Sequence, residues 1–408
     1  MRLTSGLRLG SIRGIEITAD ASLLVIFLLI LFSLATAIFP AWHPEWSPGL
    51  SWFTAFCAAI LFCASVLVHE LSHALVGRTH NVVIRRITLF MFGGIAHMEG
   101  EPPSWRAELS MAIVGPVTSL VLGFVFLWLA GFIGGPLNIN PDNPQETLAA
   151  LSPAATLLLW LGPVNIGLGL FNLVPGFPLD GGRVLRALMW GLTGNLQLAT
   201  RWASNAGQIF AWLLMSAGIL MILGLRVPFL GGGFLNGVWL AFVGWYLNNA
   251  ALMSYQQLLI RTALEHVPVR KLMQTRFVRV DPQMSVSTLV NEYVMASGQR
   301  AFPVEAEGKL VGMVSLRDVQ KRARTDWEIV TVRDIMTPVP KLEMVSPDQD
   351  AVEALKAIGR LDLSQLPVVQ NNEILGLLRR EDILKWLSLH APEIPAYWEH
   401  PERASGKS

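Results

Sequence analysis

Long stretches without a charged side chain are the feature that most limits how this chain can fold. Each is long enough to cross the roughly 30 Å hydrocarbon core of a bilayer as a helix. There are six such stretches, at residues 21–42, 51–68, 109–134, 151–173, 202–225 and 227–251. A backbone inside lipid must satisfy its own hydrogen bonds, so apolar runs of this length predict spanning helices. The sequence therefore predicts a polytopic α-helical membrane protein with about six transmembrane helices.

Basic residues flank these stretches unevenly. Several arginines precede residue 21 and lie between residues 68 and 109 and between 173 and 202, whereas residues 40–50 and 135–150 contain no lysine or arginine. Lysine and arginine concentrate in cytoplasmic loops, and Arg226 is the exception to this pattern. We therefore expect both termini in the cytoplasm of a multi-pass cell-membrane protein, in the plasma membrane of a prokaryote.

Charge divides the chain into an apolar part and a polar part. The sequence has 31 basic and 30 acidic side chains, of which 20 and 20 lie from Arg261 onward. This division predicts a membrane domain over residues 1–255, a polar domain over 267–388 and a flexible tail at 389–408. The equal numbers of positive and negative charges in the polar part give no electrostatic footprint for nucleic acid.

The second apolar stretch runs directly into the sequence His69-Glu70-Leu71-Ser72-His73. On a helix, residues i and i+4 share a face, so His69 and His73 can offer two imidazole nitrogens to one zinc ion. Glu70 is rotated by about 100° toward the open coordination position, where a general base is needed. Ionisable side chains are costly inside a membrane and mark functional sites there. The motif therefore predicts a zinc hydrolase centre.

A catalytic zinc ion usually has three protein ligands, so a third side chain is needed. Asp180 is the strongest candidate, because it ends the segment Asn172 to Asp180, in which two prolines and a glycine must stop the fourth helix. Irregular backbone at membrane depth is tolerated only where it is buried in protein or lines a wet cavity. The alternative interpretation of Asp180-Gly181 is a simple interfacial turn.

Two amides lie on one face of the fourth stretch, at Asn165 and Asn172. Amides in membrane helices often bond a neighbouring helix. Asn172 lies beside the helix break, and it is the better candidate for holding substrate or the oxyanion formed when a peptide bond is attacked.

Residues 82–99, between the second and third stretches, are rich in β-branched side chains and interrupted by glycine. They predict a membrane-associated strand or β-hairpin that dips into the site, with its bend at Gly93 and Gly94. An open strand edge here can pair with an unwound substrate and expose a peptide bond that a helix would shield, which makes Gly93 and Gly94 candidate substrate-binding residues. His97 is interpreted as an ordinary polar contact, with a further metal ligand as the alternative.

These motifs together resemble the site-2 proteases, intramembrane zinc metalloproteases that cut membrane-spanning substrates. The resemblance covers about residues 9–255 and begins with the strand-like residues 10–17. It rests on the HExxH motif, the Gly-Gly-Ile-Ala loop, Gly115-Pro116 and the segment 172–183. It implies that His69, His73 and Asp180 bind zinc, that Glu70 is the general base and that Asn172 orients the substrate. One departure is Ser119, where many relatives carry asparagine.

The polar part contains an internal repeat displaced by 64 residues. Phe302-Pro303-Val304 recurs as Leu366-Pro367-Val368, and residues 312–318 recur as 376–382. Residues 267–324 and 332–388 each show strand, helix, strand, strand, helix patterning, which predicts an α+β module. The two repeats resemble a pair of cystathionine-β-synthase (CBS) domains.

In that family the paired repeats often bind adenine nucleotides. The resemblance implies that Asp318 and Asp382 contact the ribose of ATP or AMP and that Ser315 lies near its phosphate. Arg379 stands where the second repeat would need its hydroxyl. A structural module that joins two copies of the chain into a homodimer is therefore the alternative to nucleotide binding.

The expected function is regulated intramembrane proteolysis of membrane-spanning proteins within the lipid bilayer, with one zinc ion per chain. A CBS-gated transporter or channel is an alternative, but it would not require Glu70 beside His69 or the helix break before Asp180. An inactive membrane scaffold is a second alternative, although it would tolerate loss of Glu70.

Overall fold

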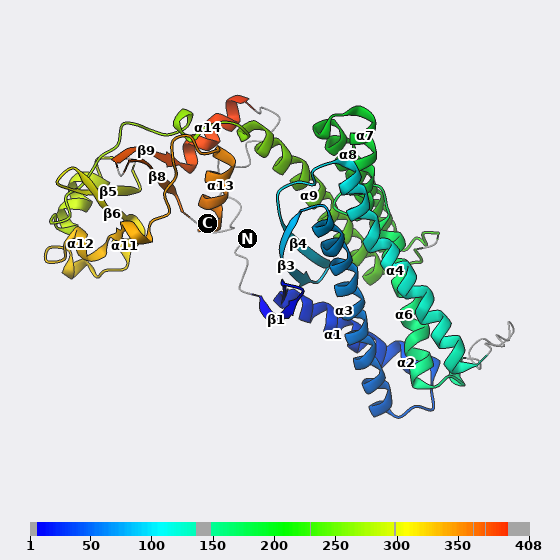
Figure 1. The fold of residues 1–408 in the computed structure, drawn as a ribbon. Helices are drawn as coiled ribbons and strands as arrows, with labels where there is room; N and C mark the ends of the chain where they lie inside the picture. The colour runs from blue at the N-terminus through cyan, green and yellow to red at the C-terminus, as the bar shows by residue number, and fades with distance from the viewer. Residues whose placement is uncertain are drawn as a thin grey trace. The chain divides into compact units, whose positions relative to one another are not determined.

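The computed structural model describes residues 6–135, 148–228, 230–297, 299–361, 363–371 and 373–390 (Figure 1). The chain divides into two compact units, Met1–Tyr255 and Gln256–Ser408. The division falls within helix α9 (Phe234–Leu264), which contributes residues to both units.

Five helical segments of the first unit are long and apolar enough to cross a membrane. They are Ala21–Trp42, which comprises α1 (Ala21–Ser33), a π-helical turn (Leu34–Ile38) and α2 (Phe39–Trp42), then α3 (Pro48–Thr79), α4 (Trp105–Gly134), α6 (Pro153–Asn172) and α8 (Leu196–Ile222). Many of their large apolar side chains are exposed, as expected of helices whose outer faces meet lipid. The predicted helical membrane architecture is confirmed.

The sixth predicted stretch gives a different kind of helix. It was expected from Val227, but α9 begins at Phe234, and Val227 forms an isolated β-bridge with Gly231. The helix is long enough to span a bilayer, yet Asn236, Asn248 and Asn249 make it less apolar than the other five. A further helix that the apolar pattern did not predict, the amphipathic α7 (Asp180–Thr193), follows the break after α6.

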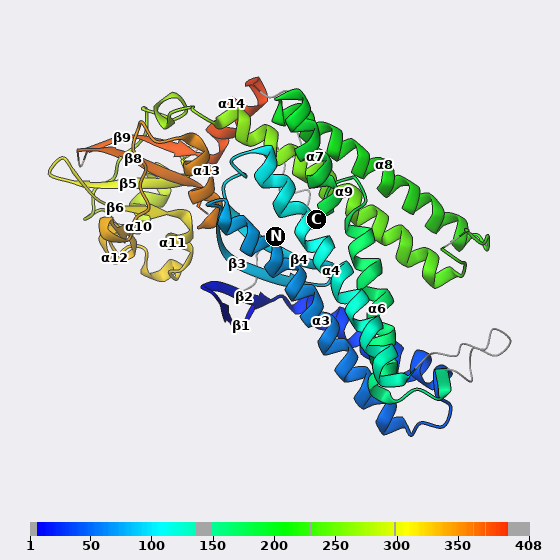
Figure 2. The same ribbon diagram turned by 45° about the vertical axis from the view of Figure 1, so that its right-hand side comes forward.

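A four-stranded sheet packs beside α3 (Figure 2). Its order is β1 (Leu7–Ile12), β2 (Ile15–Ala19), β3 (Val83–Phe90) and β4 (Gly93–Glu99). Strands β2 and β3 are parallel, and the other two pairs are antiparallel. The predicted strand near residues 10–17 is thus a hairpin, and the hairpin predicted over 82–99 is confirmed.

The bend of the β3–β4 hairpin lies slightly earlier than predicted. The turn is formed by Met91 and Phe92, while Gly93 and Gly94 already belong to β4, paired with Phe90 and Leu89. Gly93 has φ of +133°, a conformation that side chains rarely adopt, so a glycine is needed where the chain leaves the turn.

Apolar side chains fix the sheet against α3 and α4. Ile84, Ile87 and Leu89 of β3 are buried in one cluster with Val66 of α3 and Met111 of α4. Full burial of such side chains stabilises the fold by about 1.5–3 kcal/mol each. The hairpin is therefore held next to the part of α3 that carries the HExxH motif.

The second unit contains two similar halves. The first comprises α10 (Val286–Thr288), a π-helical turn (Leu289–Val294), β5 (Ala301–Ala306), β6 (Lys309–Ser315) and α11 (Leu316–Gln320), and the second comprises α13 (Ala351–Arg360), β8 (Gln365–Gln370), β9 (Glu373–Arg379) and α14 (Arg380–His390). The first predicted strand of each half is reduced to one parallel bridge, Val280 with Val304 and Val345 with Val368. Residues 391–408, which contain most of the predicted tail, lie outside the described residues.

The two halves interlock through the segments that open them. The backbone of Gln274 pairs with Leu377 of β9, and the short strand β7 (Thr337–Pro338) pairs with β6. Gly312 and Gly376 occupy equivalent places, because a Cβ at either would approach the opposite segment to within 3 Å. Each half therefore completes the other, and the pair forms one module.

Candidate metal centre

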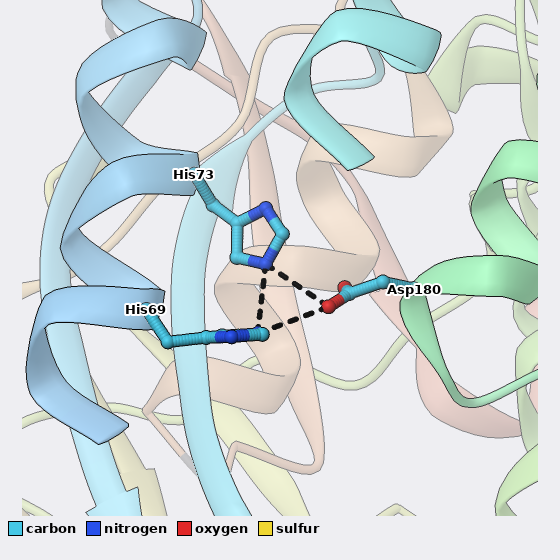
Figure 3. A group of neighbouring side chains, drawn as sticks. All are labelled: His69, His73 and Asp180. Atoms are coloured by element: carbon cyan, nitrogen blue, oxygen red, sulfur yellow. Dashed lines mark hydrogen bonds and ion pairs between the residues drawn. The ribbon is translucent and has the colours of Figure 1, made fainter. Parts of the chain in front are cut away.

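Three side chains from distant parts of the chain meet at one point (Figure 3). His69 and His73 lie one turn apart on α3, and Asp180 is the first residue of α7. The Oδ2 atom of Asp180 is 3.1 Å from Nε2 of each histidine, and the two Nε2 atoms are 3.2 Å apart. The structure thus brings together the three residues that the sequence suggested as metal ligands.

Hydrogen bonds hold the other nitrogen of each imidazole. The Nδ1 atom of His73 donates to the carbonyl oxygen of Met111 at 2.5 Å, and Nδ1 of His69 lies 2.8 Å from the hydroxyl of Ser119. A carbonyl oxygen can only accept, so His73 carries its proton on Nδ1 and keeps the Nε2 lone pair for the site. When the Ser119 oxygen accepts the hydrogen on Nδ1 of His69, the Nε2 lone pair of His69 is likewise available to the site. Ser119 is fully buried.

Close backbone packing brings Asp180 to this point. A Cβ on Gly176, in the break after α6, would lie 2.4 Å from the Cα of Gly207 in α8. A Cβ on Gly181 would lie 2.3 Å from the carbonyl oxygen of Leu173. The glycines on both sides of Asp180 therefore allow the chain to turn tightly and start α7 with a carboxylate directed at the two histidines.

A buried ion cluster anchors α7 to α4. The guanidinium of Arg186 on α7 donates from Nε to Glu108 at 2.6 Å and from a terminal nitrogen to Glu101 at 3.2 Å. Glu108 is fully buried, and Arg183 lies 3.9 Å from its carboxylate. Removing one partner of a buried pair costs about 3–5 kcal/mol. In the sequence, these arginines indicated only the orientation of the helices, and this anchoring role was not predicted.

The donor atoms and the space between them suit a metal ion. Ligand atoms at about 2.0–2.2 Å from a tetrahedral zinc would be roughly 3.3–3.6 Å apart, close to the 3.1–3.2 Å found here. Gly115 of α4 keeps this space open, because a Cβ there would lie 2.1 Å from Nε2 of His73 and 2.8 Å from Nε2 of His69. Within the described ranges, this trio is the group of potential ligands close enough to share an ion.

Glu70, the predicted general base, lies next to the β3–β4 hairpin. Its Oε1 atom accepts the backbone N–H of Gly94 at 3.1 Å. A Cβ on Gly94 would lie 2.4 Å from Cγ of Glu70, whereas one on Gly93 would be 4.0 Å from its carboxylate. The two glycines predicted to contact substrate thus lie beside the predicted base.

The remaining polar candidates do not join the trio. Asn172 and Asn165 each donate to a carbonyl oxygen one turn earlier in α6, at 3.0 and 2.9 Å. His97 lies 3.1 Å from the hydroxyl of Thr88 on the neighbouring strand, which fits its interpretation as a polar contact. Burial and, secondarily, the positive charge of Arg86 lower the pKa of His97.

The two predicted nucleotide contacts of the second unit differ. Asp318 accepts hydrogen bonds from the hydroxyl and the N–H of Ser315, at 2.6 and 3.1 Å, and the two residues form a capping box at the start of α11. The ammonium of the exposed Lys321 also lies 3.0 Å from Asp318. Asp382 accepts two hydrogen bonds from the guanidinium of Arg379, at 2.9 and 2.8 Å, and it is buried. The arginine that replaces the second hydroxyl therefore neutralises the second aspartate.

Family models match both units of this chain. The family model described as Peptidase family M50 matches residues 57–135 and 131–217, and the CBS domain model matches 269–324 and 332–389. A Synechocystis chain, sll0528, whose name describes a zinc metalloprotease, is 32% identical over 95% of this chain and 97% of its own length. Rip3 of Mycobacterium tuberculosis, named in the same way, is 30% identical over 97% of each chain. The solved site-2 protease of Methanocaldococcus jannaschii is 27% identical and covers 61% of this chain and 95% of its own, with a TM-score of 0.41.

The relatives extend over almost the whole chain at 30% identity or more, which places both units in one known type of protein. The family's names specify zinc, and the apolar helices indicate a membrane protein. This chain belongs to peptidase family M50, the family of the site-2 proteases, and it is a zinc metalloprotease that carries a tandem pair of CBS domains.

Proposed function

We propose that this protein is an intramembrane endopeptidase that hydrolyses peptide bonds within or near the membrane span of other proteins, in regulated intramembrane proteolysis. The observation that carries this proposal is that Asp180 converges with His69 and His73 beside Glu70, and that the two histidines and Glu70 lie on a helix long and apolar enough to span a bilayer. Arginines at the same end of several helices support cytoplasmic termini in a multi-pass plasma-membrane protein.

In this proposal, His69, His73 and Asp180 hold one zinc ion. Zinc, when bound, acts as a Lewis acid that polarises the scissile carbonyl and acidifies water. Glu70 takes a proton from the attacking water and returns it to the leaving amine. Asn172 orients the substrate by exchanging its bond to its own helix for one to the substrate carbonyl.

The substrate backbone pairs with the open edge of β4. In the described sheet, β4 has β3 on one side and no strand on the other. The carbonyl oxygen of Leu89 in β3 accepts the N–H of Asp20. The N–H and C=O of Leu89 therefore face β2 and not Gly94, its partner in β4. Gly94 therefore directs its own N–H and C=O to the open edge, where Glu70 lies. A substrate strand added at this edge would place its peptide bonds beside the base.

The test combines zinc content with cleavage of a co-expressed single-span reporter. Glu70→Gln should keep zinc and lower the cleavage rate by roughly 10²–10⁴-fold, because it removes the base and no ligand. Asp180→Ala should lower both zinc content and cleavage. Wild-type cleavage by Glu70→Gln would overturn the proposed mechanism, whereas absence of reporter cleavage by the wild-type protein would favour a transporter or scaffold.

We also propose that adenine nucleotides regulate proteolysis through the first CBS cleft. The observation that favours the first repeat is the contrast between Asp318, held by a neighbouring hydroxyl and by the exposed Lys321, and Asp382, held by two hydrogen bonds from Arg379. ATP or AMP should bind the purified protein in calorimetry and change reporter cleavage, and Asp318→Ala should weaken both effects. Absence of binding at millimolar nucleotide would leave a homodimerising module.

A further inference from the structure

We infer that the backbone N–H of Gly94 positions Glu70 for proton transfer, and that the substrate strand pairs with β4 from Ala96 onward. This inference rests on the proposed role of Glu70 as the base. It gives the two N–H groups at the open edge of β4 different roles: the N–H of Gly94 binds the base, Glu70, and the N–H of Ala96 binds the substrate.

These two roles follow from the alternating direction of the backbone N–H groups along β4. Gly94 directs its N–H away from β3, and Oε1 of Glu70 accepts that hydrogen at 3.1 Å. Successive residues of a strand face opposite edges, so Ile95 faces β3 and Ala96 again faces the open edge. A substrate cannot use the Gly94 N–H while Glu70 accepts it. Ala96 is therefore the first residue of β4 whose N–H is directed to the substrate side without this bond.

The position of Gly94 is set from both sides of the hairpin turn. The ring of Phe92 stacks on Tyr246 of α9, with centroids 4.1 Å apart and planes 21° apart. The N–H of Met91 donates to the hydroxyl of Ser22 at the start of α1, at 3.3 Å. The turn is thus attached to two helices, and this attachment gives the Gly94 N–H a defined place relative to α3.

Glu70 needs such a partner because its side chain has three rotatable bonds and must present a lone pair to one water molecule. A misplacement of about 1 Å in a catalytic group can cost roughly 100-fold in rate. A hydrogen bond from a fixed N–H selects one orientation of the carboxylate and leaves its second oxygen available for the proton. Glycine is required at this position because a Cβ would lie 2.4 Å from Cγ of Glu70.

The first test separates turnover from substrate affinity. Gly94→Ala should push Glu70 aside and lower kcat for a purified single-span substrate by roughly 100-fold, with KM within about threefold of wild type and an unchanged zinc content. Gly167→Ala is the matched control, because a Cβ at that membrane-helix glycine has no atom within 4 Å. Its kcat, KM and zinc content should equal those of the wild type.

The second test addresses the substrate side of the edge. Ala96→Pro removes an N–H that faces away from β3, a place where a strand edge tolerates proline. It should raise KM by roughly tenfold, the effect of losing about 1.4 kcal/mol of binding, with kcat nearly unchanged. Gly94→Ala should thus change mainly kcat, and Ala96→Pro mainly KM.

A third variant keeps the inference testable if Gly94→Ala does not fold. Tyr246→Leu removes the ring that supports Phe92 and should lower kcat by a smaller factor than Gly94→Ala, with zinc retained, and Tyr246→Phe should recover most of the loss. Combining Tyr246→Leu with Gly94→Ala should add little, since both act through the orientation of Glu70.

Two results would overturn the inference. One is a Gly94→Ala protein with raised KM and normal kcat, which would make Gly94 a substrate contact. The other is loss of zinc in that variant, which would make it a support of the metal centre. Both differ from failure of the proposed function, which shows as an active Glu70→Gln protein.

Discussion

The carboxylates of the two units differ in how the fold satisfies them. The shortest polar contacts of Asp318 and Asp382 come from residues three positions away in the chain, Ser315 and Lys321 for the first and Arg379 for the second. Asp180 has instead been brought against two buried histidines more than 100 residues away in sequence, and in the described part of the chain no arginine or lysine pairs with it. A carboxylate held by its neighbours in sequence already has a structural role, whereas one assembled by tertiary structure opposite two imidazole nitrogens has the arrangement of a metal site. The structure therefore supports a functional role for Asp180 more directly than for Asp318 or Asp382.

The largest expected effect tests whether the space between the three ligands is needed. Gly115→Ala would place a Cβ 2.1 Å from Nε2 of His73, so the variant should lose zinc and reduce reporter cleavage by at least 100-fold. Metal analysis of the purified protein checks the first effect and the cleavage assay the second. The matched control is Gly131→Ala on the same helix, where a Cβ has no atom within 4 Å. Full zinc content in Gly115→Ala would mean that the histidines and Asp180 do not share an ion.

A smaller effect is expected at Ser119, the buried partner of His69. Groups that orient a metal-binding histidine typically account for 10- to 100-fold in metal affinity. Ser119→Ala should therefore weaken zinc binding by roughly 10- to 100-fold, measured by competition with a chelator of known affinity. Thr118→Val is the neighbouring control, because the Thr118 hydroxyl donates to the carbonyl oxygen of Val114 in its own helix. Equal zinc affinity in both variants would show that Ser119 only fills space.

The parts of this molecule that sequence could predict are those determined by local periodicity. The two histidines of α3 share a face because they are four residues apart, and Asp180 was found because prolines and glycine interrupt α6. Five of the six apolar runs coincide with helices that are long and apolar enough to span a membrane, and the β3–β4 hairpin followed from its β-branched residues. Its turn was misplaced, because glycines usually mark a bend but here begin a strand.

Contacts between distant segments could not be predicted in this way. Ser119 meets His69 across 50 residues, and Arg186 meets Glu108 across 78. No pattern in the sequence links these pairs, although the spacing of Asp180, Arg183 and Arg186 places them on one side of α7. Two arginines on the same side of a helix as a candidate ligand could have indicated that this helix is anchored by charge.

The smallest effect is expected at Arg379, which stands in the second half of the second unit where the first half has Ser315. Arg379→Ser gives the second half the hydroxyl that the first half has at Ser315, and it removes the guanidinium that neutralises Asp382. If that guanidinium is what closes the second cleft, calorimetry of the whole protein should show nucleotide binding rise from about one site toward two. The added site should be weak, because Asp382 remains buried and an N–H of Gln274 also lies 3.4 Å from it. Lys385→Ser is a control on the same helix, α14, which leaves the Asp382 pair intact. An unchanged stoichiometry would show that the shape of the cleft, and not the charge of Arg379, excludes a nucleotide there.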